Sequence, residues 1–306
     1  MGKVCFVFPG QGSQQVGMGR AAFDVDAGRT VFEQADRALG EAITRLCFEG
    51  PDTELQLTAN AQPAILTTSV ALFRLLAETA DVMAGHSLGE YSANVAAGAL
   101  PFEEAVVLVR KRGRYMQEAV PPGHGAMAAV LGGDVAVVER ICEETEGVVS
   151  PVNYNCPGQL VIAGEAAAVE RACAALQSAG SKVRILHVSA PFHCALMQPA
   201  EARLEPELRA ASWRDPEVPI YVNVDAEPRT TRDAASLALV RQVSRPVRWQ
   251  QSVERMLADG VSLFVEIGSG KVLTTMIRRI AKDVERVNVE SPSDIVAARA
   301  AIARHR

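Results

Sequence analysis

The chain has 306 residues, of which 48% are hydrophobic and 22% charged, and this balance is typical of a globular protein with a sizeable core. Its formal net charge of −5 excludes a global basic footprint for nucleic acid. No apolar run approaches the roughly 18 residues that a transmembrane helix needs, so no membrane partner is expected.

The cysteines indicate a cytoplasmic protein without a metal. They are scattered without a C-x-x-C pair, so the spacing of a zinc site is absent. Because the short apolar start of the chain ends at Pro9-Gly10, it predicts a strand and turn and not an export signal, and we expect reduced thiols. Cys194 adjoins a histidine, and we interpret it as a packing residue because a serine lies in a better context for a nucleophile.

The first third of the chain alternates between strand and helix patterns. A short apolar run predicts a strand at 4–8, and helical periodicity follows at 60–78. A strand is expected at 81–84, and helices at 91–97 and 102–118. This alternation favours an α/β fold with a mostly parallel sheet.

The pattern changes after Pro121-Pro122-Gly123. The segments that follow have the order β-α-β-β-α-β, which is typical of a ferredoxin-like unit. They are a strand at 126–131, a helix at 134–146, strands at 148–154 and 160–164, a helix at 166–179 and a strand at 183–188. We therefore expect a small subdomain at 123–189, inserted in a large α/β subdomain formed by 1–122 and 190–306.

The last third returns to the strand and helix alternation of the first. Helices are expected at 196–211, 247–259 and 270–282, and strands at 220–224, 263–267 and 287–289. No internal repeat interrupts this order.

One serine stands in the pattern of a nucleophile elbow. Ser87 lies in Gly85-His86-Ser87-Leu88-Gly89, between an expected strand and an expected helix. The turn is too tight for side chains at the flanking positions, and it raises the hydroxyl toward the N-terminus of the next helix. There the backbone N–H of Leu88 is placed to stabilise an oxyanion.

A serine nucleophile needs a base, and five histidines are candidates. His86 adjoins the serine on a turn where neighbouring side chains diverge, and His305 lies in the tail. His187 falls inside an expected strand, and His124 at the subdomain boundary. His193 follows Ala190-Pro191-Phe192 where the chain returns to the large subdomain, so it is the preferred candidate.

Two glycine-rich stretches resemble nucleotide loops but fail the spacing. Gly10-Gln11-Gly12 would need a glycine where Gln15 stands. Gly268-Ser269-Gly270-Lys271 lacks the first glycine of a phosphate loop and has Val272 in place of Ser or Thr. No nucleotide cofactor is therefore expected.

Six motifs in order give the chain a resemblance to the malonyl-CoA:acyl carrier protein transacylase family over nearly its full length. They are FPGQGSQ (8–14), GHSLGEYSA (85–93), RGRYMQEAVPPG (112–123), NYNCPGQLVIAG (153–164), VSAPFHCALM (188–197) and RQVSRPVRW (241–249). The resemblance implies a hydrolase-like α/β core with an inserted ferredoxin-like subdomain. It also implies cytoplasmic malonyl transfer to an acyl carrier protein for fatty acid synthesis.

The resemblance also assigns the reacting groups. Ser87 corresponds to the family nucleophile and His193 to its general base. The backbone N–H groups of Gln11 and Leu88 correspond to the oxyanion hole. The implied mechanism is ping-pong through a malonyl-serine ester, with malonyl-CoA and the carrier protein as partners and no cofactor.

Further residues correspond to the substrate site of the family. Arg112 corresponds to the arginine that pairs with the malonyl carboxylate, for which a guanidinium offers a planar fork. Gln242 corresponds to the residue whose carbonyl orients the histidine. Asn153 and Asn155 are expected to face the cleft and contact the pantetheine arm, and a bulky Phe192 is expected to crowd an α-methyl group.

Other functions remain open at this stage. A thioesterase would use the same elbow and send the acyl group to water, and an acyltransferase of a polyketide synthase or malonate decarboxylase system would use the same chemistry. A non-catalytic scaffold would not need serine, histidine and arginine together. An acidic carrier protein would need a local basic patch, and the clustered candidates are Lys111 with Arg114, or Lys271 with Arg278, Arg279 and Lys282.

Overall fold

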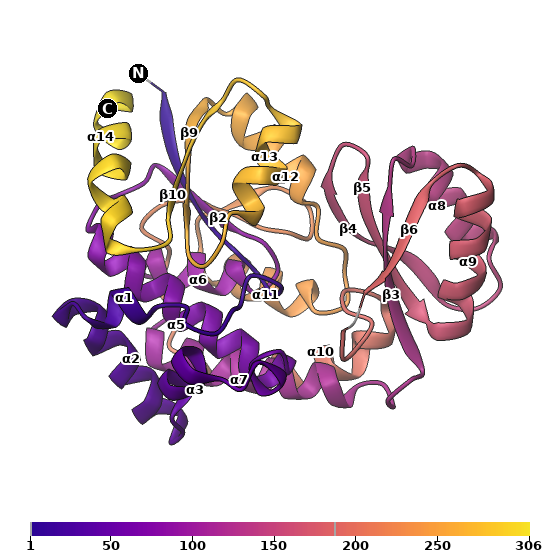
Figure 1. The fold of residues 1–306 in the computed structure, drawn as a ribbon, viewed down its shortest axis with the longest axis horizontal. Coiled ribbons are helices and arrows are strands. Elements are labelled where there is room, and N and C mark those ends of the chain that lie inside the picture. The colour runs from indigo at the N-terminus through magenta and orange to yellow at the C-terminus, as the bar shows by residue number, and fades with distance from the viewer. Residues whose placement is uncertain (1, 187) are drawn as a thin grey trace.

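The computed structural model describes residues 2–186 and 188–306, and its larger part is built on a six-stranded sheet (Figure 1). The strands lie in the order β10 (Glu285–Val289), β9 (Val261–Ile267), β1 (Lys3–Phe8), β2 (Val82–Gly85), β7 (Ile220–Tyr221) and β8 (Pro228–Arg229). Neighbouring strands pair in parallel except β7 and β8. The expected α/β fold with a mostly parallel sheet is confirmed.

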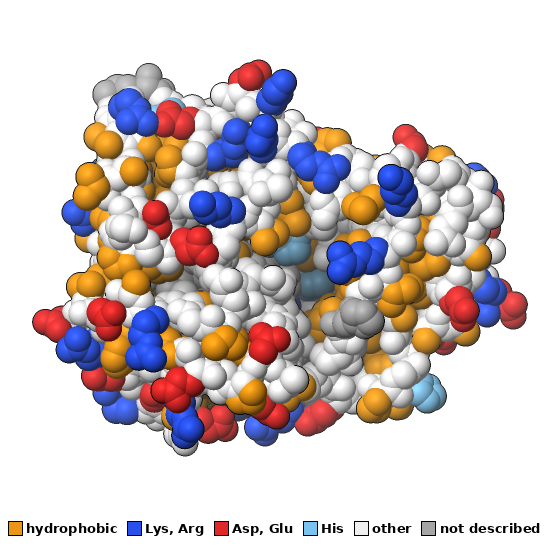
Figure 2. All heavy atoms as spheres, viewed as in Figure 1, with side chains coloured by type: hydrophobic (Ala, Val, Ile, Leu, Met, Phe, Trp, Pro, Cys, Tyr) orange, Lys and Arg blue, Asp and Glu red, His pale blue; other side chains and the backbone are white. Residues whose placement is uncertain are grey.

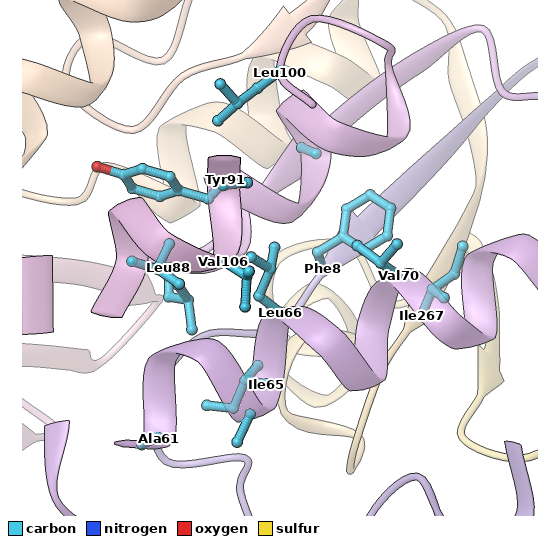
Figure 3. Close-up of a cluster of buried hydrophobic side chains, with 14 of the residues drawn as sticks. Phe8, Ala61, Ile65, Leu66, Val70, Leu88, Tyr91, Leu100, Val106 and Ile267 are labelled. Carbon is cyan, nitrogen blue, oxygen red and sulfur yellow. The ribbon is translucent and has the colours of Figure 1, made fainter. Parts of the chain in front are cut away.

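Helices cover both faces of this sheet because its central strands are apolar on both sides. Phe6 and Phe8 of β1 pack in one core cluster, while Cys5 and Val7 of the same strand pack in another. In Figure 1, α5 to α7 lie below the sheet, and α12 and α13 lie to the right of β9 and β10. The close-up in Figure 3 shows Phe8 beside α5 residues such as Val70.

The helices around the large sheet include several that the sequence patterns did not predict, namely α1 to α4, α11 and α14. The full set is α1 (Arg20–Phe23), α2 (Asp26–Leu39), α3 (Ile43–Glu49), α4 (Asp52–Leu55), α5 (Thr58–Leu76), α6 (Gly89–Ala96), α7 (Phe102–Glu118), α10 (Gln198–Ala210), α11 (Arg232–Gln242), α12 (Trp249–Ala258), α13 (Val272–Ile280) and α14 (Ile295–His305), with 3-10 turns at Ala195–Met197 and Pro292–Asp294. Within the described residues, none of these helices has both the length and the apolar character of a membrane span.

The smaller part is a four-stranded antiparallel sheet with its own core. Its elements follow as β3 (Gly125–Leu131), α8 (Val135–Glu144), β4 (Val149–Cys156), β5 (Gln159–Glu165), α9 (Ala166–Ser178) and β6 (Lys182–Leu186). The strand order is β4-β5-β3-β6, and α8 and α9 lie on the side turned away from the large sheet (Figure 1). His187, which the sequence pattern placed in the last of these strands, lies outside the described residues.

The two parts are joined by backbone pairing beside β4. The N–H of Tyr154 donates to the carbonyl of Val247 at 2.9 Å, and the N–H of Val247 donates to the carbonyl of Val152 at 2.8 Å. Between the parts the surface is hollowed, and histidine side chains lie at the bottom of the hollow (Figure 2). The pairing fixes where the small sheet stands relative to this cleft.

Candidate active site

The turn around Ser87 is as tight as its glycines predict. A Cβ at Gly85 would lie 1.9 Å from the carbonyl carbon of Gly89, and a Cβ at Gly89 would lie 1.9 Å from the carbonyl oxygen of Phe8. Ser87 itself has a φ of 51°, in the left-handed region that non-glycine residues seldom occupy. The strand therefore turns into α6 through one strained residue whose side chain faces the cleft.

Ser87 and His193 form a hydrogen-bonded pair although 106 positions separate them. The Oγ atom of Ser87 lies 2.8 Å from Nε2 of His193. The Nδ1 atom of His193 lies 2.8 Å from the carbonyl oxygen of Gln242, which can only accept, so Nδ1 carries the proton and Nε2 is free to accept from the serine hydroxyl. Burial, with the nearby charge of Arg112, lowers the pKa of His193 to about 3, so the ring is neutral at neutral pH.

Arg112 enters the site from α7 and is only 2% exposed. Its Nη1 donates to Oε1 of Gln62 at 2.8 Å, its Nη2 donates to Oε1 of Gln242 at 2.9 Å, and the same Nη2 lies 3.3 Å from the Oγ of Ser87. Among the described residues it forms no ion pair with Asp or Glu, and its Nε has no hydrogen-bond partner. The result is a buried cation with free donor capacity beside the serine.

The neighbouring basic residues of α7 face elsewhere. Arg110 pairs with Glu41, and Lys111 pairs with Glu207 at 2.7 Å on the outer surface. Arg114 is exposed. Only Arg112 of this basic run reaches the cleft.

Two backbone N–H groups are available next to the serine. Gln11 follows β1 and lines the cleft, and Leu88 precedes α6 with its side chain in the core (Figure 3). In the described part of the chain, neither N–H donates to a protein acceptor, whereas the N–H of Ser87 donates to Oδ1 of Asn223 at 2.6 Å. The pair at Gln11 and Leu88 thus remains free for an oxyanion.

The other expected substrate residues line the same cleft. A cavity of about 310 Å³ holds Ser87, His193 and Arg112, and Phe192 and Asn153 also line it. It borders a second cavity of about 230 Å³, which shares Gln11, His86 and Asn153 with the first and adds Asn155. The Oδ1 atom of Asn153 is buried without a partner in the described residues, so it could accept a ligand donor.

His86 is not placed to act as the base. Its Nε2 lies 3.0 Å from the Oδ1 of Asn155, and its ring packs 5.8 Å from that of Trp249. The side chains of adjacent residues diverge on this turn, as the sequence predicted. One of the two expected cleft asparagines is thereby engaged by the protein itself.

Three buried polar residues of the site were missed by sequence reasoning. Gln62 holds Arg112 from α5, where a glutamine inside a buried helical stretch was the available signal. Glu90 is fully buried and contacts the side chain of Gln242, and burial raises the pKa of this carboxyl to about 7. Asn223 follows β7 and had no distinguishing sequence pattern.

The remaining chemical candidates are accounted for by packing. The carboxylate of Glu266 accepts the backbone N–H groups of Leu273 at 3.0 Å and Thr274 at 2.7 Å, so the first turn of α13 after the apparent phosphate loop is already occupied. The thiol of Cys194 contacts the carbonyl of Pro191, and burial raises its pKa to about 11, which keeps it protonated. Within the described residues no cluster of three or more His, Cys, Asp or Glu side chains could hold a metal ion.

Comparisons with known proteins agree over nearly the whole chain. Residues 5–295 match the model of the acyl transferase domain family. The malonyl CoA-acyl carrier protein transacylases of Escherichia coli (strain K12) and Bacillus subtilis (strain 168) are 49% and 45% identical, over 97% and 96% of this chain and 99% and 96% of theirs.

Solved structures agree as closely. The malonyl CoA-acyl carrier protein transacylase from Coxiella burnetii superposes with a TM-score of 0.94 at 42% identity, covering 97% of this chain and 96% of that one. A malonyl-transacylase in complex with its type II PKS acyl-carrier protein gives a TM-score of 0.94 at 43% identity, covering 97% and 98%.

Proposed function

The chain belongs to the acyl transferase domain family, and from this membership we propose that it transfers a malonyl group from malonyl-CoA to the phosphopantetheine thiol of an acyl carrier protein, supplying fatty acid synthesis. The observation that carries the proposal is the guanidinium of Arg112, which is buried 3.3 Å from the Oγ of Ser87 and forms no ion pair with an acidic residue in the described part of the chain. Thioester cleavage alone needs only the serine, the base and the oxyanion hole. A cation beside them suits an acyl group that ends in a carboxylate.

In the first half-reaction, His193 takes the hydroxyl proton of Ser87 at Nε2 while Oγ attacks the thioester carbonyl carbon. The tetrahedral oxyanion accepts the free N–H groups of Leu88 and Gln11. When the C–S bond breaks, the proton on Nε2 passes to the sulfur and coenzyme A leaves as the thiol. The carrier protein's thiol then attacks the serine ester, and the same steps run in reverse.

Arg112 links substrate choice to the strength of the base. Its positive charge is one cause of the low pKa of His193. A malonyl carboxylate paired with the guanidinium would neutralise that charge and raise the proton affinity of Nε2. An acetyl group brings no such charge, so it neither satisfies Arg112 nor strengthens His193.

The cleft also suggests how the rest of the substrate is held. Asn153 and Asn155 line the cavity that continues from the serine, which supports a role in binding the pantetheine arm. Phe192 lines the acyl cavity, which supports the exclusion of an α-methyl group. No cofactor enters this reaction, and the expected cytoplasmic location stays a prediction.

For the carrier protein, the better of the two basic clusters is the one near α13. Its members are Lys271, Arg278, Arg279 and Lys282, all exposed, and α13 borders the cleft through Val272, Leu273 and Met276. Lys111 of the other cluster is already paired with Glu207. Charge reversal at Arg278 and Lys282 is expected to raise KM for the carrier protein and leave KM for free pantetheine unchanged; equal changes would remove this surface from consideration.

We propose the finer fold assignment on the same footing. The order β4-β5-β3-β6 with antiparallel pairing supports a ferredoxin-like subdomain at 123–189. The strand-turn-helix elbow on a mostly parallel sheet supports a hydrolase-like core formed by 1–122 and 190–306.

Intact mass after mixing the protein with malonyl-CoA tests the function directly. A malonyl adduct is expected, absent in Ser87→Ala and much weaker with acetyl-CoA, and a holo carrier protein should discharge it. Steady release of free malonate without an adduct would favour a thioesterase. Discharge by a polyketide carrier protein but not by a fatty acid carrier protein would favour the polyketide alternative, which the type II PKS relative keeps open.

A further inference from the structure

The strained turn at Ser87 is held by one side chain from a distant part of the chain. Asn223 is fully buried just after β7, 136 positions from the serine. Its Oδ1 accepts the N–H of Ser87 at 2.6 Å, and its Nδ2 donates to the carbonyl of Gly85 at 2.7 Å. The single amide therefore binds the backbone on both sides of His86, where the strand turns into the elbow.

Asn223 is itself fixed from α6. Its backbone N–H donates to Oε2 of Glu90 at 2.8 Å, and the same carboxylate oxygen accepts Nε2 of Gln242 at 2.9 Å. Gln242 Nε2 also donates to the carbonyl of Ser87 at 3.0 Å. The elbow is thus hydrogen-bonded at Gly85, at the N–H of Ser87 and at its carbonyl, all to buried groups.

Resting on the proposed function, we propose that Asn223 is a positioning residue, which holds Ser87 at its left-handed φ of 51° and so keeps Oγ aligned with His193. A residue in this region persists only where its surroundings hold it there. Occupation of the Ser87 N–H also leaves the oxyanion to Leu88 and Gln11 alone. Asn223 touches no reacting atom; it acts through the backbone of the turn.

The test compares Asn223→Ala with Asn94→Ala. Asn94 is equally buried, on α6, and its Nδ2 bonds to the carbonyl of Glu90 at 2.8 Å without contacting the elbow. Both variants lose a buried amide, so both are expected to unfold at lower temperature. Only Asn223→Ala should lose roughly 100-fold in the single-turnover rate of Ser87 malonylation, because misplacement of a reacting atom by about 1 Å costs that much. KM for malonyl-CoA should change less than about threefold, since Arg112 keeps its partners.

Reaction of Ser87 with phenylmethylsulfonyl fluoride separates this proposal from the proposed function. The reagent needs an aligned serine and base but no malonyl site, so Asn223→Ala should also slow sulfonylation while Asn94→Ala reacts like the wild type. If both variants lose stability and both keep wild-type acylation and sulfonylation rates, Asn223 is merely structural and the proposal fails. A wild type that is sulfonylated but never malonylated would overturn the proposed function instead.

Asn223→Asp covers the case in which the alanine variant does not fold. A protonated Asp can accept from Ser87 and donate to the carbonyl of Gly85, whereas an ionised Asp has no proton to donate to that carbonyl and adds a negative charge near Glu90, whose carboxylate accepts the backbone N–H of residue 223. Its malonylation rate relative to the wild type should therefore rise at least threefold from pH 8 to pH 5.5. A ratio that does not change with pH would contradict the positioning role of Asn223. The variant's rate is divided by the wild-type rate at the same pH because other ionisable groups lie nearby and are present in both proteins. These groups are Glu90, Tyr91, Arg112, Asp225, His86 and His193.

Discussion

Arg112→Gln separates the two roles of the buried guanidinium, which are to bind the malonyl carboxylate and to lower the pKa of His193. The substitution removes the cation and leaves Gln62 and Gln242, which hold it by hydrogen bonds of 2.8 and 2.9 Å. Because Arg112 is 2% exposed, a malonyl carboxylate deprived of it would be buried without a counter-charge. Truncating one partner of such a pair costs about 2–5 kcal/mol. The kcat/KM for malonyl-CoA should therefore fall roughly 30- to 5000-fold.

The same change should strengthen the base of the free enzyme. The charge of Arg112 is the second cause, after burial, of the low pKa of His193, so its removal raises that pKa toward the ordinary value. The wild-type kcat/KM should stay flat on the acid side to well below pH 6, because the ring of the free enzyme is neutral there. In Arg112→Gln the acid limb should move to higher pH.

The assay is single-turnover ester formation from malonyl-CoA and from acetyl-CoA between pH 5 and 8. Lys111→Gln is the matched control, because this neighbour pairs with Glu207 at the surface. The control should retain the wild-type preference for malonyl over acetyl, and Arg112→Gln should lose most of it. If Arg112→Gln lowers the rate of ester formation from malonyl-CoA and from acetyl-CoA by the same factor, the guanidinium does not recognise the carboxylate and the reasoning is wrong.

Three further outcomes follow from the same geometry. Because Phe192 lines the acyl cavity, wild-type kcat/KM should be higher for malonyl-CoA than for methylmalonyl-CoA by at least about tenfold, or about 1.4 kcal/mol. In a competition assay, Phe192→Ser should reduce this ratio. Equal wild-type rates with the two substrates would refute the steric argument. Burial raises the pKa of Glu90 from 4.5 to about 7. Between these two pH values the folded protein keeps a proton that the unfolded chain has released. The free energy of unfolding therefore falls as the pH rises from 4.5 to 7. Glu90→Gln should consequently gain stability relative to the wild type between pH 5 and pH 8 in urea unfolding, and a pH-independent difference would contradict the assignment. Gly89→Ala would place a Cβ 1.9 Å from the carbonyl oxygen of Phe8. The variant should lose about 1–3 kcal/mol of the free energy of unfolding in urea and should not be malonylated. An active variant of wild-type stability would show that the turn can widen.

Much of the fold was predictable because its signals are local. The strand at β1 and the helix Phe102–Glu118 follow from apolar periodicity, and the sequence placed both. The helices between residues 20 and 55 were missed: α1, α3 and α4 have only 4, 7 and 4 residues and alternate with turns, whereas α2, with 14 residues, was overlooked despite its length. The expected strand at 220–224 shortens to Ile220–Tyr221, because Asn223 leaves the sheet to bond with the elbow.

The sequence by itself determined the elbow, since its glycines answer a steric demand within five residues, and the family motifs indicated the reaction. The sequence and its motifs also pointed to His193 and Arg112, but only the tertiary structure gives the contacts that bring them to the serine and shows that Asn223 holds the turn. These contacts join segments as many as 138 positions apart. They depend on how strand ends, loops and helix faces pack around one cleft, and the local periodicity of the sequence does not determine that packing.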